Sequence, residues 1–405
     1  MTHPATPLTF SGNFTQQEAI PEDAILAAVA VMKGGRLHRY NVANAEEVSE
    51  TAALEMEYAN YQDQRFCLAC ASGGYAIQLA LRATGIKPGD RVLTNGFTLS
   101  PVPGAIQAVG GIPVLVETTS DLVIDLEHLE QVIKSSGSKL LLLSHMRGHL
   151  VDMDALCKLI DAHDVTMIED CAHTMGASFN GIKSGAHGAM ACFSSQTYKH
   201  INSGEGGLLT SNNEEMMARA IVLSGSYMLF ERHEAAPGAH AFQALKLETP
   251  NCSGRMDNLR AAILRPQLQN LDDNGVRWNQ RYDAFAIALK ENSNAIELPA
   301  RHPKAYEVPS SIQFRIPHFS NEENQQFLET CAARGVDIKW FGAEEPKAYT
   351  SRYDSWKYLE PTSLPKTDEV LKRLYDCRLP LTFSVEECAL IGRIVAEVTQ
   401  SITGD

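Results

Sequence analysis

The sequence predicts an α/β fold built on a parallel sheet. Continuous apolar runs recur along the first half of the chain, and stretches with helical periodicity separate them. Strands that are buried on both faces of a parallel sheet produce such runs, and the alternation of strand with helix places the strands in one sheet. One run, Val165–Ile168, leads directly into Glu169 and Asp170. Polar residues at a strand end mark the carboxyl edge of the sheet, where ligands bind.

The bulk composition limits the class of protein. A chain of 405 residues is longer than one hydrophobic core usually serves, so two domains are expected. Apolar residues make up 44% and charged residues 21%, which is ordinary for a globular protein. The net charge of −14 argues against binding to nucleic acid or to an anionic membrane, both of which need a basic face.

The cellular compartment is predicted from cysteine usage and from the apolar segments. The nine cysteines are scattered, which favours a reducing compartment, the cytoplasm. The first residues lack a basic stretch followed by an apolar core, so no signal peptide is expected. The longest apolar stretch, Ala24–Met32, is too short to cross a bilayer, so no membrane association is predicted.

The elements follow in order from local patterns. The motif Pro-Glu-Asp at 21–23 suits the first turn of a helix that ends at Gly34–Gly35. The next loop carries Arg36, Arg39 and Tyr40, which are either plain surface residues or the lip of a site. Further helices are expected at 46–61, 75–83, 126–133, 153–162, 213–224 and 257–271. Strands are expected at 66–70, 91–94, 112–116, 140–143, 165–168, 190–193 and 208–210.

The remainder predicts a second domain and two loops. Residues 311–316 alternate like a half-exposed strand, and 337–340 form another strand. Helices are expected at 322–333 and 387–398, the last one behind a capping box formed by Ser384 and Glu387. Residues 226–241 are polar and rich in Gly and His, which indicates a flexible loop. The aromatic-rich loop 341–358 either borders a site or simply packs.

Two cysteines form a lone C-x-x-C motif, Cys67 and Cys70. A zinc site needs two more ligands, and the sequence has no second pair at metal spacing. A redox pair would open a helix N-terminus, whereas these residues lie within a predicted strand. We therefore interpret both as core cysteines and expect no metal site.

The segment from Ile168 to Gly207 carries the chemistry. Asp170 stands at a strand end, and Lys199 stands alone in a polar loop that the glycines at 204, 206 and 207 close. A lysine amine can form a Schiff base with the aldehyde of pyridoxal 5′-phosphate. A carboxylate can keep the pyridine nitrogen of that cofactor protonated, so that the ring stays an electron sink. A single lysine or acid would more often be a solvated charge or a helix cap, and only the combination predicts this site.

The segment resembles the DegT/StrS-type sugar aminotransferase family. The resemblance rests on E-D-x-A-H from Glu169, G-A-x-x-x-G, a lysine five residues after Ser194, and G-E-G-G. It covers about Gly34 to Leu381 and implies fold type I of the pyridoxal-phosphate enzymes. That fold has a mostly parallel seven-stranded sheet sandwiched by helices and a smaller C-terminal α/β domain. We accordingly predict an N-terminal arm and large cofactor-binding domain at 1–250 and a small domain at 251–405.

The resemblance also assigns roles to single residues. Lys199 and Asp170 would be catalytic, and His173 would bond the phenolate oxygen of the cofactor. Ser194 and the turn Ser72–Gly73–Gly74 would hold the cofactor phosphate, because a strand–turn–helix unit aims amide groups and a helix dipole at an anion. Without the resemblance, a turn with no ligand and a structural His173 would be the default interpretations.

Three positions depart from the family pattern. Gly74 stands where the family usually has threonine, Leu99 where an aromatic ring stacks on the cofactor, and Ser253 where an asparagine reaches the neighbouring subunit's cofactor phosphate. Phe97, the aromatic residue nearest to Leu99, is assigned to the core. His145 and Arg147 follow a strand at the same edge and either face substrate or are structural, the latter being the default.

The resemblance implies an aminotransferase. Its donor would be glutamate or glutamine, its acceptor a keto-sugar or related carbonyl compound, and its assembly a homodimer with shared sites. The alternatives are a sugar dehydratase, in which histidine replaces the lysine, and a non-catalytic sensor that retains the fold. A cysteine desulfurase is disfavoured because Tyr198 precedes the lysine where histidine is usual, and a nicotinamide-binding protein because no G-x-G-x-x-G follows a strand.

Overall fold

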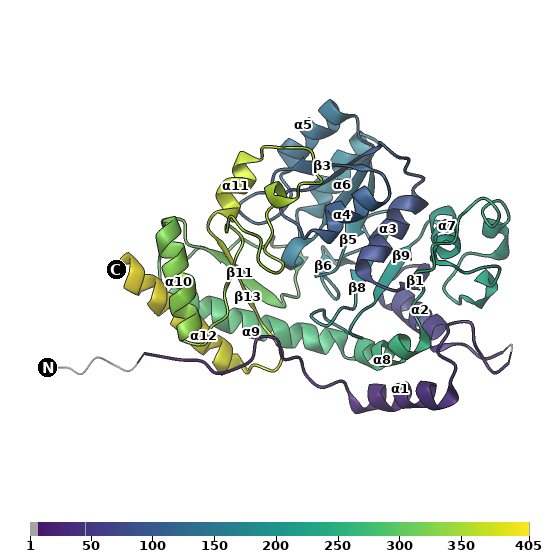
Figure 1. Ribbon diagram of the computed structural model, residues 1–405, viewed down its shortest axis with the longest axis horizontal. Helices are drawn as coiled ribbons and strands as arrows, with labels where there is room; N and C mark the ends of the chain where they lie inside the picture. Colours follow the sequence, from purple (N-terminus) through teal and green to yellow (C-terminus); the bar gives the residue numbers. More distant parts are fainter. Residues whose placement is uncertain (1–6, 45, 405) are drawn as a thin grey trace.

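The structure is a computed structural model, and it describes residues 7–44 and 46–404. The first six residues of the predicted N-terminal arm therefore lie outside the described residues. The fold is built on a seven-stranded sheet in the order β1-β9-β8-β5-β4-β2-β3 (Figure 1). These strands are β1 Phe66–Cys70, β2 Arg91–Asn95, β3 Ile112–Val116, β4 Leu140–Ser144, β5 Thr166–Asp170, β8 Met190–Ser194 and β9 Gly207–Ser211.

The sheet is mostly parallel, as predicted. Strands β3, β2, β4, β5 and β8 pair in parallel, and β9 runs antiparallel to both of its neighbours, β8 and β1. Because β5 lies in the middle of the sheet, its carboxyl end and that of β4 meet at the centre of one edge. This is where an open α/β sheet binds its ligands.

Helices cover both faces of the sheet. The twelve α-helices of the described residues are α1 Glu22–Gly34, α2 Glu50–Tyr61, α3 Gly73–Ala83, α4 Pro101–Ala108, α5 Leu126–Ser136, α6 Met153–Ala162, α7 Glu214–Ser224, α8 Asn258–Gln269, α9 Leu271–Asn292, α10 Asn321–Ala333, α11 Pro365–Leu371 and α12 Val385–Thr403. Successive strand residues point to opposite faces. Thus Leu68 packs with Leu81 of α3 and Ile221 of α7, whereas Cys67 packs on the other face with Leu54 of α2. Cys67 and Cys70 are both buried and unbridged, which confirms their interpretation as core residues.

The long helix α9 joins two hydrophobic cores. Its first residue, Leu271, packs with the large sheet, and its later residues Phe285 and Leu289 pack with α12 and the small sheet β11-β13-β12 (Figure 1). Helix α8 also packs with the large sheet, through Leu264. This packing favours a domain boundary inside α9 rather than at residue 250, and the division itself stays a prediction. The strands are β11 Ser311–Arg315, β12 Lys339–Trp340 and β13 Leu374–Arg378.

The arm at residues 7–21 crosses to the C-terminal core. Phe10 and Phe14 pack edge-on against Phe383, with ring centroids 4.9 and 5.0 Å away. The arm therefore packs the beginning of the chain against the core of the small sheet. No helix within residues 7–44 and 46–404 is both long and apolar enough to cross a bilayer.

Most predicted elements are present, and some differ in extent or in local structure. Helix α2 begins at Glu50 rather than at 46, because Ser49 caps it by accepting a hydrogen bond from the Ala52 amide. Strand β12 spans two residues only. The segment 226–241 contains short 3₁₀ turns at Phe230–Arg232 and Ala239–Phe242, whose Phe230 and Phe242 rings stack at 4.3 Å, so it is more structured than the predicted loop. The capping box of Ser384 and Glu387 is confirmed.

The prediction that β11 is half-exposed is wrong. Residues Ser311 to Phe314 are all buried. Ile312 and Phe314 face the C-terminal core, and the opposite, polar face is covered by the large domain, where Gln313 bonds His149 at 2.8 Å. Alternation in the sequence identifies the polar face of a strand but does not show whether another part of the chain covers it.

Two further β-pairings complete the fold. Strands β6 Ser178–Phe179 and β7 Ile182–Lys183 form a small hairpin, and β10 Ala305–Tyr306 pairs with β6. The remaining 3₁₀ turns are Met146–Gly148 and Tyr353–Ser355. The hairpin follows β5 and pairs through β6 with β10 in the C-terminal part of the chain.

Candidate active site

Asp170 ends β5 at the carboxyl edge of the sheet. Its Oδ2 accepts a hydrogen bond from Ser144 Oγ at 3.1 Å, and its Oδ1 accepts one from the Ala172 amide at 3.2 Å. Ser144 in turn accepts a bond from Thr98 Oγ1 at 2.8 Å. Burial raises the pKa of the Asp170 carboxyl, and the Ala172 amide, Lys199 and Ser144 oppose that rise. The carboxylate is therefore positioned by Ser144 at the end of β4 and by the Ala172 amide just after β5.

Lys199 lines a cavity of about 280 Å³ beside that edge. Its Nζ donates a hydrogen bond to His173 Nε2 at 2.7 Å. Burial, helped by the positive charge of Arg147 and Arg378, lowers the pKa of the Lys199 amine to about 7, while Asp170 acts in the opposite direction. Burial also lowers the pKa of His173 well below its ordinary value, so the imidazole is neutral and can accept this bond. A lysine of this kind can lose its proton near neutral pH, which is what a nucleophilic or proton-transferring amine requires.

The loop that carries Lys199 depends on Gly206. The Ser195 amide donates to the Gly206 carbonyl at 2.9 Å, and the Thr197 amide donates to the Gly204 carbonyl at 3.1 Å. Gly206 has φ +157°, and a Cβ there would lie 2.2 Å from Ser195 Oγ. The G-E-G-G motif therefore closes the lysine loop by permitting a close backbone approach.

The predicted phosphate turn is assembled next to the lysine loop. Ser72 caps α3, and its side chain accepts a bond from the Tyr75 amide. The amides of Gly73 and Gly74 are the first two of the helix and have no acceptor within it. A Cβ on Gly73 would lie 2.8 Å from Ser194 Cβ, so the absence of a side chain allows the turn to touch Ser194. Gly74 is different, because the nearest atom to a Cβ there is Pro101 Cβ at 4.0 Å.

Leu99 lines the cavity together with His173 and Lys199, and Phe97 does not. Phe97 is buried in a cluster with Phe341, its ring centroid 5.0 Å from that of Phe341, so its assignment to the core is confirmed. Ser253 is exposed, with φ +52°, and it is not part of the cavity within the single chain.

His145 and Arg147 have different roles although they are two residues apart. His145 Nε2 lies 3.0 Å from Glu169 Oε2, and the amides of Gly185, His187 and Gly188 also donate to that carboxylate. The default structural interpretation of His145 is therefore confirmed. Arg147 lines the Lys199 cavity and also pairs with Asp376 at 3.3 Å, so a role toward substrate stays a prediction for this residue.

One cluster has the composition of a metal site. One ligand atom each from His145, Glu169 and Cys171 lies within 4.8 Å of the others. The Glu169 oxygens already accept four hydrogen bonds, and burial raises the pKa of the Cys171 thiol well above its ordinary value. A neutral thiol and an occupied carboxylate are poor metal ligands, so we assign no metal to this cluster.

Arg39 is neither a surface residue nor the lip of a site, so both interpretations of the loop at Arg36, Arg39 and Tyr40 are wrong for this residue. Its side chain is fully buried and donates to both carboxylate oxygens of Glu55, at 2.7 and 2.8 Å. His233 lies 3.0 Å from Arg39, and Tyr40 bonds the same imidazole at 2.8 Å. This network joins the loop after α1 to the segment after α7. Sequence patterns missed it because its members are up to 194 positions apart.

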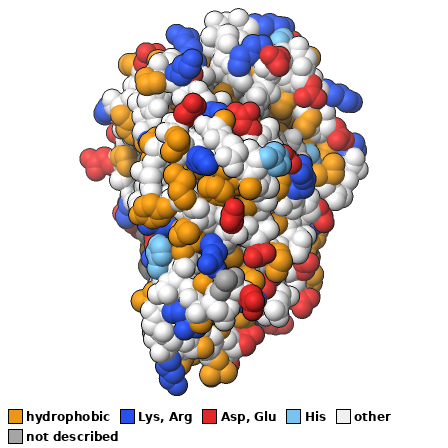
Figure 2. Space-filling model, turned by 90° about the vertical axis from the view of Figure 1, so that its right-hand side faces the viewer, with side chains coloured by type: hydrophobic (Ala, Val, Ile, Leu, Met, Phe, Trp, Pro, Cys, Tyr) orange, Lys and Arg blue, Asp and Glu red, His pale blue; other side chains and the backbone are white. Residues whose placement is uncertain are grey.

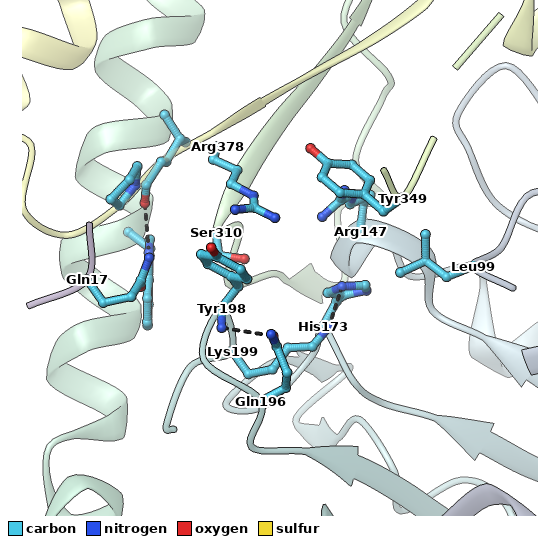
Figure 3. Close-up of a pocket in the computed structure, with 13 residues that line it drawn as sticks. Gln17, Leu99, Arg147, His173, Gln196, Tyr198, Lys199, Ser310, Tyr349 and Arg378 are labelled. Carbon is cyan, nitrogen blue, oxygen red and sulfur yellow. Dashed lines mark hydrogen bonds between the residues drawn. The ribbon is translucent and has the colours of Figure 1, made fainter. Parts of the chain in front are cut away.

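The cavity also contains residues that were not predicted. Arg378 ends β13, and its guanidinium carbon lies 3.8 Å from the centre of the Tyr198 ring. Tyr349 comes from the aromatic-rich loop, so the interpretation that this loop borders the site is confirmed. In Figure 3, Lys199 and His173 lie on one side of the cavity, and Arg147, Arg378 and Tyr349 lie on the opposite side. Gln17 and Trp278 complete one wall.

The fold and this lysine-centred cavity define the class, which is that of the aminotransferases. The family is equally plain: residues 23–398 match the DegT/DnrJ/EryC1/StrS aminotransferase family, and the chain belongs to it. The resemblance found in the E-D-x-A-H and G-E-G-G motifs is thereby confirmed.

Individual relatives agree with this assignment. The chain is 32% identical to GDP-perosamine synthase of Caulobacter vibrioides over 54% of this chain and 56% of that protein, so the match spans little more than half of the relative's length. It is 33% identical to dTDP-3-amino-3,4,6-trideoxy-alpha-D-glucose transaminase of Streptomyces venezuelae over 71% of each chain. Among solved structures, S. venezuelae DesV in complex with a ketimine intermediate superposes with a TM-score of 0.79, 25% identity, and coverage of 97% of this chain and 98% of that chain.

Proposed function

We propose that this protein is a pyridoxal-phosphate-dependent aminotransferase that moves an amino group from glutamate or glutamine to a keto-sugar or related carbonyl acceptor. The observation that carries the proposal is the Lys199 amine, whose pKa is lowered to about 7 and which lies 2.7 Å from His173, three residues after the end of β5 at Asp170. The names of the relatives support a sugar acceptor, since one contains GDP-perosamine and the other a dTDP-linked amino-trideoxyglucose.

The residues present fit the cofactor. The unpaired amides of Gly73 and Gly74 suit a phosphate at a helix N-terminus, and Ser194 touches the same turn. Lys199 would bind the cofactor covalently, Leu99 would contact one face of its ring, and His173 would reach the phenolate oxygen. Ser253 of a second copy would complete the phosphate site. When bound, the cofactor supplies an electron sink for the carbon from which the proton is removed.

The chain's own groups would supply positioning and proton transfer. Once free, the Lys199 amine can take a proton from a donor carbon and return one to the acceptor carbon, because its pKa lies near neutral pH. Ser144 and the Ala172 amide hold Asp170 in place to bond a protonated ring nitrogen.

A homodimer whose two subunits share their active sites is part of the proposal. Figure 2, which faces the side that carries α7, shows hydrophobic side chains among charged ones. Three exposed apolar side chains, Tyr227, Met228 and Leu229, lie in the loop that follows α7. Burial of such side chains against a second copy would support a dimer and bring Ser253 to the other site. We retain the cytoplasm as the predicted compartment.

The two alternatives remain distinguishable. A dehydratase with a catalytic histidine is disfavoured, because Lys199 is present and its neighbour His200 bonds the Val308 carbonyl at 2.9 Å, with a pKa that burial lowers to about 4. A non-catalytic sensor is favoured only by the departures at Gly74, Leu99 and Ser253. Such a protein would give no turnover.

A transamination assay tests the proposal. The purified protein, loaded with cofactor, is mixed with L-glutamate or L-glutamine and a panel of keto-sugars and keto-sugar nucleotides, and the products are identified by mass spectrometry. We expect an aminated product that Lys199→Ala fails to form and that Lys290→Ala, an exposed lysine of α9, forms normally. A sugar product that has lost water but gained no amino group, formed while the amino donor is consumed, would contradict transamination.

A further inference from the structure

The Arg147 guanidinium is buried and incompletely bonded. Its side chain is only 8% exposed, and its Nε and Nη2 have no hydrogen-bond partner among the residues that the structure describes. Buried donors without a partner are costly, so they are rare in folded proteins unless a ligand satisfies them. Its backbone adds to the strain, because Arg147 adopts φ +58°, a left-handed conformation that is uncommon for residues other than glycine.

A carboxylate near Arg147 does not supply the missing bonds. Asp376 Oδ1 lies 3.3 Å from Arg147 Nε, an ion pair without hydrogen-bond geometry. The two oxygens of Asp376 already accept bonds from Gln313 Nε2 and Tyr349 Oη, each at 2.6 Å. Asp376 therefore balances one positive charge electrostatically and leaves the guanidinium donors of Arg147 free.

Arg378 adds a second positive charge on the same side of the cavity. Its guanidinium lies 5.2 Å from the centre of the Tyr349 ring, and the Arg147 guanidinium lies 4.3 Å from that centre. Arg378 makes no ion pair with a carboxylate anywhere in residues 7–44 and 46–404. Arg147 and Arg378 carry two positive charges and Asp376 carries one negative charge, so this side of the cavity has a net charge of +1.

Both arginines lie close to the amine that would do the chemistry. They line the same cavity as Lys199 (Figure 3), and the charge of each lowers the pKa of Lys199. The predicted phosphate turn at Ser72–Gly74 is not part of this cavity's lining, so the arginines are not the groups that the family resemblance assigns to the cofactor phosphate. An anionic group bound by these arginines would therefore belong to the substrate and lie close to the carbon that loses or gains the amino group.

We propose that Arg147 and Arg378 form a carboxylate subsite, which the amino donor and the carbonyl acceptor occupy in turn. This inference rests on the proposed aminotransferase function and defines its acceptor as a carbonyl compound that itself carries a carboxylate, such as a keto-sugar acid. A planar fork of N–H donors matches a carboxylate in a bidentate manner. A monoanion would neutralise the net charge of +1 on this side of the cavity, whereas a phosphate dianion would leave an excess negative charge.

The carboxylate on the acceptor is inferred because donor and acceptor occupy the same cavity in turn. Donor and acceptor use one cavity of about 280 Å³ beside the same lysine, so an acceptor group must replace the donor carboxylate at the arginines. A neutral hydroxyl there would leave the buried Arg147 and the half-buried Arg378 with one counter-charge between them, which is unfavourable. A carboxylate on the acceptor restores the balance.

The first test measures binding rather than turnover. Calorimetry on the cofactor-loaded protein uses glutarate and D-galacturonate, with glutaramide and D-galactose as their uncharged counterparts. We expect each acid to bind at least about tenfold more tightly than its counterpart, and Arg147→Gln and Arg378→Gln each to remove that preference. The matched control is Arg301→Gln, another partly buried arginine, which pairs with Glu307 at 3.0 Å outside the cavity and should leave binding unchanged.

The outcomes separate the two sources of the carboxylate. Weaker binding of both acids in both variants supports the shared subsite. Loss of glutarate binding alone would restrict the subsite to the donor and overturn the inference about the acceptor, and unchanged binding of both acids would overturn the subsite itself. If Arg147→Gln does not fold, as its melting temperature would show, Arg378→Gln and Arg147→Lys carry the same test.

Failure of the proposed function gives a different result. A protein that forms no yellow, borohydride-reducible chromophore would refute the aminotransferase, and the acids would then be titrated into the protein without cofactor. A protein with that chromophore but without any acid preference would refute only the carboxylate subsite. Stopped-flow mixing of the aminated protein with an acidic and a neutral carbonyl compound then compares the two acceptor classes directly.

Discussion

Lys199 Nζ donates a 2.7 Å hydrogen bond to His173 Nε2, three residues after the strand-ending Asp170. Two segments that are 26 positions apart thus meet at one point of the sheet edge. The bond positions the amine in the cavity, and burial together with the charges of Arg147 and Arg378 lowers the pKa of that amine. The proposed chemistry depends on this geometry, and each of the following predictions changes one part of it.

Asp170→Asn should preserve cofactor binding and reduce turnover. The amide occupies the same volume but cannot stabilise a protonated ring nitrogen, and loss of such a charge interaction reduces catalysis by about 100-fold or more. The visible spectrum and single-turnover rates with L-glutamate measure the two effects separately. The milder variant Ser144→Ala removes the 3.1 Å bond to Asp170 together with the bond that Ser144 accepts from Thr98, and it should cost about tenfold or less. Near-normal turnover of Asp170→Asn would remove Asp170 from the mechanism.

The reactivity of Lys199 should follow a pKa near neutral pH. Burial and the two arginines lower the pKa of the amine from 10.5 to about 7, so the reactive unprotonated fraction rises as the pH increases through about 7. Competitive labelling of the cofactor-free protein, with peptide mass spectrometry, measures this. The exposed Lys290 serves as the internal control.

Removing one of the neighbouring charges should shift that titration in a known direction. Arg378→Gln deletes a positive charge that disfavours protonation of Lys199, so the pKa of the amine should rise. The same labelling experiment would show the midpoint moving to higher pH. An unchanged or lower midpoint would contradict the position of Arg378 beside the amine.

The two glycines of the phosphate turn should tolerate substitution differently. In Gly73→Ala the new Cβ would lie 2.8 Å from Ser194 Cβ, whereas in Gly74→Ala the nearest atom is 4.0 Å away. Displacement of the turn should weaken cofactor retention by about tenfold or more in the first variant, since overpacking costs about 1–3 kcal/mol. Gly74→Ala should retain the cofactor normally. Equilibrium dialysis measures both, and equal effects would contradict the proposed role of the turn.

Much of the fold was predictable, because local patterns determine it. The runs at Phe66–Cys70 and Ile112–Val116 match strands β1 and β3 residue for residue, since strands buried on both faces carry their own signal. Asp170, His173 and Lys199 were likewise found from one short stretch. The burial of β11 was not predicted, because the residues that cover Gln313 belong to the other part of the chain.

The pairing of Arg147 with Arg378 in the cavity could not be predicted from local sequence either. Arg147 and Arg378 are 231 positions apart (378 minus 147) and meet only when β13 is placed against the edge of the large sheet. Nothing local distinguishes Arg378 from a surface arginine, and nothing local shows that His145 points into the protein while Arg147 points into the cavity. Such juxtapositions depend on the packing of two cores, which sequence periodicity does not encode.

The most direct measurement of the central claim is the identity of the lysine that holds the cofactor. The protein is incubated with pyridoxal 5′-phosphate, reduced with borohydride, digested and analysed by peptide mass spectrometry. The proposed function predicts one phosphopyridoxyl group per chain, attached to Lys199 and absent from Lys199→Ala. Stable modification of a different lysine, or no modification at all, would contradict it.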